Sequence, residues 1–222
     1  MRDSRRFVLP AGLLLAVAFG ACAALPYTAD LSSREIRPPT MLTSSQIPRT
    51  LFIVVQSSRV PNDFQIRDSP HSIRNFRGYF GRALTRTLDT YFQTVRVVPT
   101  APTPAQLASA GPSAIADVRV DGIENRDLPT ARYTYRVLRM QWAFAIRPAE
   151  AEDYLFSYGG IGTSDHAYQT LEDGVEQLML SAIAGFLEGW TEEEVFQAFR
   201  RLPTPGETSG GVDEEPDPAE AI

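Results

Sequence analysis

The stretch "RYTYRVLRMQWAFAIR", residues 132–147, decides the fold because it carries the longest strand pattern in the chain. Apolar residues occupy every second position from Leu138 to Ile146, as expected for a strand with one buried face. The phase of this alternation changes between Val137 and Leu138. Strict alternation on one face does not allow that change, so we expect a β-bulge or a change of covering layer at this point.

Four shorter segments predict the other strands of the sheet. They are apolar or alternating, and turn residues bound them. The four segments are "LFIVVQ" at 51–56, "VRVV" at 95–98, "ADVRVDGIEN" at 116–125 and "YLFSYGGIG" at 154–162. The polar residues 148–153 predict a hairpin connection between the last two strands.

Two long helices are predicted from apolar residues that recur at intervals of three or four. The first begins at Pro70 with Asp68 or Ser69 as its cap, and the second is capped by Ser164 or Asp165. The apolar stripe of the first helix comprises Ile73, Phe76, Phe80, Leu84, Leu88, Phe92 and Val95. The stripe of the second comprises Leu171, Val175, Leu178, Ala182, Phe186 and Trp190.

The order of these elements predicts an α+β fold. We expect a single mixed or antiparallel sheet of about five strands, with the two long helices packed on one face. The face without helices must then be covered or meet a partner. Met140, Trp142 and the tyrosines of residues 132–147 are the candidates for that face.

The first residues of the chain have the pattern of a bacterial signal peptide. Three arginines precede an apolar run from Phe7 to Phe19, which is shorter than the roughly 20 residues that cross a bilayer. The only cysteine, Cys22, falls where this run ends. We therefore expect export from the cytoplasm.

Two interpretations of Cys22 remain open. Gly20 and Ala21 before the cysteine resemble a lipobox, although Phe19 stands where leucine is usual. Alternatively, Ala21-Cys22-Ala23 is an A-x-A site for ordinary signal peptidase, and cleavage would then discard the cysteine. The position of Cys22 favours the lipobox.

These features predict four regions. Residues 1–21 form a lipoprotein signal peptide, and residues 22–50 form a flexible tether anchored by lipid at Cys22. Residues 51–202 form the α+β periplasmic domain, and residues 203–222 form a disordered acidic tail.

Composition excludes several classes of protein. The formal net charge is −6 and the acidic tail accounts for it, so no basic footprint for nucleic acid is present. A single cysteine allows no internal disulfide, and two histidines make a histidine-rich metal site improbable. We predict no cofactor and no metal.

No residue pattern in the chain indicates catalysis. The glycines of "YGGIGTSD", residues 158–165, are simpler to explain as a strand exit than as a phosphate loop. Ser164, Asp165 and His166 are adjacent and point in different directions, so they do not form a triad.

One face of the first predicted helix is basic. Arg74, Arg77, Arg82 and Arg86 lie away from its apolar stripe. They form either a surface for an acidic partner or lipid headgroups, or simply a solvated helix face, which is the plainer interpretation.

The layout resembles that of small proteobacterial envelope lipoproteins. The matching parts are the leader ending at Cys22, "IPRTLFIVV", "FGRALTRTLDTYFQTVRVVP", "ADVRVDGIEN", "YRVLRMQWAFAI" and "LEDGVEQLMLSAIAGFLEGW". The plan is similar to that of transport-auxiliary lipoproteins, which partner lipid-trafficking ABC systems, and of envelope-assembly lipoproteins. The resemblance implies a diacylglyceryl thioether on Cys22. Because Ala23 and Ala24 are not acidic, it also implies sorting to the outer membrane.

The expected function is therefore that of a non-catalytic periplasmic domain. It would be held at the outer membrane by Cys22 and would serve as a binding, assembly or transport accessory with a protein or lipid partner. The alternatives are a self-associating structural lipoprotein, an envelope hydrolase, or a soluble periplasmic protein that has lost Cys22.

Overall fold

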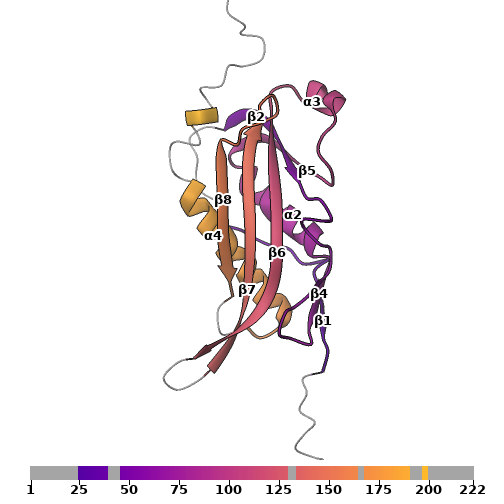
Figure 1. Ribbon diagram of the computed structural model, residues 1–222, viewed down its shortest axis with the longest axis vertical. Coiled ribbons are helices and arrows are strands. Elements are labelled where there is room, and N and C mark those ends of the chain that lie inside the picture. Colours follow the sequence, from indigo (N-terminus) through magenta and orange to yellow (C-terminus); the bar gives the residue numbers. More distant parts are fainter. Residues whose placement is uncertain (1–24, 40–45, 130–133, 165–167, 191–196, 200–222) are drawn as a thin grey trace, which may run out of the picture.

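The computed structural model describes residues 25–39, 46–129, 134–164, 168–190 and 197–199 of the 222-residue chain. Within these residues the strands form two sheets, one of five strands and one of three. Figure 1 shows the five-stranded sheet in front of the two long helices, with the small sheet at one side.

The larger sheet has the strand order β5-β2-β6-β7-β8. Strand β2 is parallel to both of its neighbours, whereas β7 is antiparallel to both β6 and β8. The crossover from β2 to β5 contains helix α2, and the crossover from β5 to β6 contains α3 (Pro104–Ala110). The strands are β2 (Ile47–Val54), β5 (Phe92–Val98), β6 (Ser113–Pro129), β7 (Thr134–Pro148) and β8 (Phe156–Thr163).

The smaller sheet has the order β1-β4-β3. It consists of β1 (Thr28–Asp30), β3 (Phe64–Gln65) and β4 (Ser72–Arg74). Strand β4 is parallel to β1 and antiparallel to β3. The prediction of a single sheet with two long helices is therefore wrong, because three short segments that it assigned to a tether, a loop and a helix pair with one another.

The core lies between the five-stranded sheet and helices α2 (Phe76–Leu88) and α4 (Leu171–Trp190), which pack on the same side of it. Trp142 of β7 joins the two helices. Its ring lies 5.8 Å from Phe80 of α2 and 5.8 Å from Phe186 of α4, measured between centroids. Met140 is also in this core, so the expectation that Met140 and Trp142 lie on the helix-free face is wrong.

Helix α2 is much shorter than the predicted helix. It is preceded by Asn75 in the left-handed conformation, with φ of 60°, and Ile73 lies before it in β4. Its last turn ends at Asp89, whose N–H bonds to the Thr85 carbonyl, and Phe92 begins β5. The caps predicted at Asp68 and Ser69 are therefore wrong.

The irregularity expected in β7 lies in its neighbour. The pairing of β6 with β7 shifts register between Val120 and Gly122 of β6, while it runs on unbroken at Val137 and Leu138. Both of these residues of β7 are buried, and as neighbours in a strand they face opposite sides of the sheet.

Several predictions fall outside the described residues. These are the signal peptide 1–21, the lipidation site Cys22 and the acidic tail 203–222. Part of the expected tether is described, however, and residues 25–39 lie on the domain with Leu31 and Ile36 buried. Among the described helices, none is both long and apolar enough to span a membrane.

Candidate functional site

A groove between α2 and β5 has a volume of about 690 Å³. Val55, directly after β2, and Val95 and Val97 of β5 form its apolar part, and arginines of α2 form its polar wall. The groove is lined by Val55, Asn62, Arg77, Gly78, Gly81, Arg82, Thr85, Arg86, Val95, Val97 and Pro99. We refer to this site as the basic groove.

The groove exists because α2 carries glycine where it approaches β5. A Cβ atom on Gly81 would lie 3.2 Å from Cγ1 of Val97, so the helix passes close over the strand at this point. Gly78, one turn earlier, has no side chain to fill the space beside it, and a Cβ there would meet only the Arg82 guanidinium at 3.5 Å. The two glycines leave the valines of β5 accessible.

Strand β5 is the last strand of its sheet in the described part of the chain. The Val55 N–H bonds to the carbonyl of Val98 at 2.9 Å, so Val98 directs its backbone groups toward β2. Successive residues of a strand alternate in this direction. Val95 and Val97 therefore direct their N–H and C=O groups toward the outer edge, beside the basic groove.

Residues 25–39, here named the N-terminal strap, cross α2 and are held by its arginines. Nη2 of Arg82 donates to the carbonyls of Leu31, Ser32 and Arg34 at 3.0, 3.3 and 3.4 Å. Arg86 donates to the Ile36 carbonyl. A guanidinium has five N–H donors, so these bonds leave donors available to a further group in the groove.

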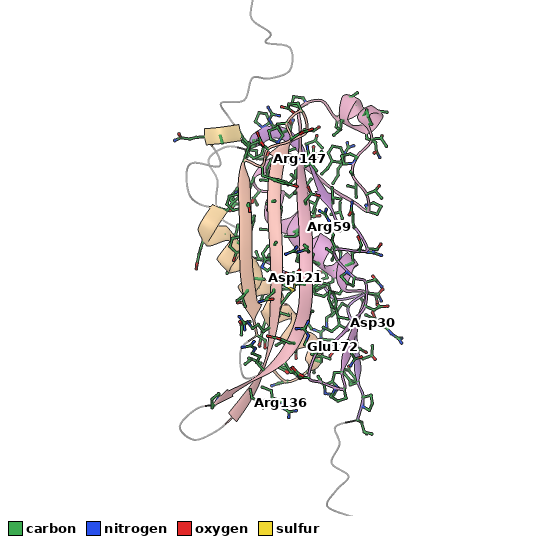
Figure 2. The ribbon with its side chains drawn as sticks, viewed as in Figure 1. Asp30, Arg59, Asp121, Arg136, Arg147 and Glu172 are labelled. Atoms are coloured by element: carbon green, nitrogen blue, oxygen red, sulfur yellow. The ribbon has the colours of Figure 1, made fainter. Side chains whose placement is uncertain are left out.

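The strap also connects α2 with α4. Arg34 lies 3.4 Å from the Asp173 carboxylate, and the Tyr27 hydroxyl donates to Glu172 at 2.7 Å. This hydrogen bond and the charge of Glu172 raise the pKa of Tyr27. Figure 2 shows Glu172 toward the same end of the molecule as Asp30 of β1.

Asp30 links the strap to the start of α2. Its carboxylate accepts hydrogen bonds from the Asn75 side chain at 2.9 Å and from the Ser32 N–H at 2.9 Å. The bond from Asn75, followed by those from Ser32, holds the pKa of Asp30 below its usual value. The residue that starts α2 is thereby tied to β1.

We expect Arg82→Ala to loosen the strap and to lower the free energy of unfolding by about 1–3 kcal/mol, because three carbonyls lose a charged donor. Amide exchange in residues 31–36 should become faster, and urea unfolding measures the loss. Arg77→Ala is the matched control, since Arg77 forms no hydrogen bond or ion pair with the described residues and should change stability by less than about 0.5 kcal/mol. Equal losses in both variants would contradict this role of Arg82.

The helix-free face of the five-stranded sheet is charged but internally paired. Arg59 lies 3.4 Å from Asp117, and Arg119 lies 2.8 Å from Asp121. Figure 2 shows Arg59 and Asp121 on this face. The basic groove differs, because none of its lining residues is acidic and only Glu35, 3.8 Å from Arg86, pairs with its arginines among the described residues.

The residues examined for catalysis have structural roles where they are described. Ser164 is buried, and its Oγ and N–H bond to the N–H and carbonyl of Leu138, which closes the β7–β8 pairing. His71 lies before β4, with its N–H bonded to Ser69. Gly159, Gly160 and Gly162 lie inside β8 and form no phosphate loop. Asp165 and His166 lie outside the described residues, and the described residues hold no cluster of three metal-ligating side chains.

The basic face predicted from the sequence is divided by the structure. Arg74 belongs to β4, whereas Arg77, Arg82 and Arg86 line the groove. The spacing of these arginines was visible in the sequence, whereas the placement of the valines opposite them and the strap that they hold were not. The alternation of Val95 with Val97 was visible, but nothing in it showed that this strand would lie at a sheet edge.

Comparisons with known proteins identify a shared fold but no family for this chain. No family model matches the chain, and no curated protein matches it. Among solved structures, protein XCC0632 from Xanthomonas campestris, assigned to the family model DUF330, has a TM-score of 0.51 at 10% identity and covers 79% of this chain and 99% of its own. The chain therefore shares the fold of that bacterial protein.

Two further structures are less similar. A putative neuraminyllactose-binding hemagglutinin homolog from Helicobacter pylori has a TM-score of 0.42 at 11% identity, covering 75% of this chain and 97% of its own. The hypothetical protein CT253 from Chlamydia trachomatis has a TM-score of 0.38 at 10% identity, covering 67% and 98%.

Proposed function

We propose that this protein is a lipid-anchored accessory of the bacterial cell envelope whose domain binds a partner and performs no catalysis. The observation that carries the proposal is the position of Cys22 at the end of a signal-peptide core. The fold shared with a bacterial protein and the basic groove on the domain are compatible with it.

The chemistry of the basic groove supports a binding role. Its ionisable lining residues are arginines, which stay protonated at neutral pH and cannot act as general bases. Guanidinium groups recognise carboxylates and phosphates, and the neighbouring valines add apolar contact area. The groove therefore fits a partner that is both acidic and partly apolar, such as an acidic protein segment or an anionic lipid.

The location follows from the anchor. Several acyl chains on Cys22 would bind the membrane firmly, since each buried methylene contributes about 0.8 kcal/mol. The residues after Cys22 are alanines, which resembles the sorting pattern of outer-membrane lipoproteins. We propose the periplasmic face of the outer membrane as the site of action, with a protein or lipid of the envelope as partner.

Cys22→Ser tests the proposal. In a bacterium that processes lipoproteins, the unaltered chain should incorporate labelled palmitate and sediment with the membranes. The Cys22→Ser chain should incorporate none, and most of it should leave the membrane fraction. The control is Ser32→Ala in the strap, which keeps the cysteine and should remain at the membrane.

The mass of the mature chain distinguishes the alternative cleavage. A mature chain that begins after Ala23, without label and in the soluble fraction, would show that Cys22 is discarded. That result would contradict the anchor and with it the proposed location.

A further inference from the structure

We propose that the basic groove holds an acidic segment of the same chain, residues 206–215, as an added strand beside β5. The inference deepens the proposed function, because it concerns what occupies and regulates the same groove. Any partner of the groove would have to displace this segment first.

Phe199, the last described residue before the acidic tail, lies next to β5. Phe199 is buried, and its ring lies 5.8 Å from that of Phe92, the first residue of β5. The thirteen residues from Phe199 to Val212 can span at most about 43–47 Å. Strand β5 itself is about 23 Å long at 3.3 Å per residue. The tail is therefore long enough to lie along the whole groove.

Charge complementarity favours this segment. Three arginines line the groove and none of its lining residues is acidic. Residues 206–215 contain no base and four acids, Glu207, Asp213, Glu214 and Glu215. Arg77 has no ion pair with the described residues, and Arg82 and Arg86 retain unused donors.

The backbone of the segment suits an edge strand. Residues 206–215, "GETSGGVDEE", contain no proline, while Pro205 and Pro216 stand at either end. A strand that bonds to a neighbour cannot donate from proline, so the two prolines delimit the part that can pair with β5. Its partners would be the outward N–H and C=O groups of Val95 and Val97.

The single large apolar residue of the segment also has a matching position. Val212 lies directly before three acids in the sequence. Val97 lines the groove and is 40% exposed, which is unusual for a strand valine of this domain. Contact between these two valines would cover Val97 while the acids that follow meet the arginines of α2.

Amide hydrogen exchange in the full chain tests the docking independently of strand register. We expect the N–H groups of Val95 and Val97 to exchange at least about tenfold more slowly than in a variant with Glu207→Gln, Asp213→Asn, Glu214→Gln and Glu215→Gln. The protection should also fall at 1 M salt, where the screening length is about 3 Å. The control variant, Asp217→Asn with Glu220→Gln, changes acids beyond Pro216 and should keep the protection.

A disulfide test identifies the occupant. In a Cys22→Ser background, Val97→Cys with Val212→Cys should form an intramolecular disulfide in dilute protein with oxidised glutathione as oxidant. The matched control is Ile161→Cys with Val212→Cys, since Ile161 is 44% exposed on β8, the strand at the opposite edge of the sheet. We expect the first pair to close at least about tenfold faster, because docking raises its effective concentration.

The outcomes separate this inference from the proposed function. Equal exchange of Val95 and Val97 in the full chain and the neutralised variant would overturn the inference. Crosslinks formed only between two chains, or protection that appears only with anionic phospholipid vesicles, would overturn it too. None of these measurements depends on acylation of Cys22, so the anchor and the docked segment can fail separately.

Discussion

Replacing Trp142 with alanine is expected to lower the free energy of unfolding by about 3–5 kcal/mol. Trp142 is almost fully buried and contacts both long helices, through Phe80 of α2 and Phe186 of α4. Its ring also lies 5.4 Å from Tyr158 of β8. The alanine variant would lose the apolar burial of the indole and leave a cavity where both helices meet the sheet.

Urea unfolding followed by far-ultraviolet circular dichroism measures this loss. Ile161→Ala is the control, because Ile161 lies on the neighbouring strand but is 44% exposed, and its loss should be within about 0.5 kcal/mol. A loss below about 1 kcal/mol for Trp142→Ala would show that the two helices do not depend on this side chain. The Trp142→Phe variant should recover part of the stability, since it keeps an aromatic ring in the same place.

The longest strand of the larger sheet could be predicted because its sequence has a regular period. Even-numbered residues of β7 from Leu138 to Ile146 are all in the core, so the alternation correctly indicated one buried face, although Met140 and Trp142 were expected on the face without helices. The hairpins from β6 to β7 and from β7 to β8 connect neighbours in the chain, which is the commonest arrangement for antiparallel strands. The local sequence pattern and the short connections were sufficient to predict these three strands.

The smaller sheet could not be predicted, because its strands have two or three residues and no period. Ile73 and Phe76 stand three residues apart, as they would on one face of a helix. The structure separates them by Asn75 in the left-handed conformation, and Ile73 pairs with Ala29 of β1 instead. Tertiary pairing with a segment more than forty residues away decided this local structure, and no window around Ile73 contains that information.

The candidate site, too, was visible in the sequence only in part. The arginines of α2 were found because their spacing places them on one helix face, away from the apolar stripe. The groove required two further facts that the sequence does not state. One is that β5 lies at the edge of the sheet, and the other is that Gly81 allows α2 to approach Val97. Both depend on the order of strands, which is set by packing across the whole domain.

Gly162→Ala is expected to lower the free energy of unfolding by about 1–3 kcal/mol, because it overfills the contact between β8 and α4. An added Cβ would lie 2.6 Å from the Leu178 carbonyl oxygen and 2.8 Å from the Ala182 Cβ, so a backbone segment of α4 must move. Gly159→Ala, three residues earlier in the same strand, is the control.

A Cβ on Gly159 would meet nothing within 4 Å. An unfolded chain with alanine at this position has less conformational entropy to lose on folding than one with glycine. We therefore expect Gly159→Ala to be neutral or to stabilise the protein by up to about 1 kcal/mol. Thermal and urea unfolding of the two variants should thus shift in opposite directions or differ by at least about 1 kcal/mol. Equal shifts would show that α4 does not pack tightly against β8 at Gly162.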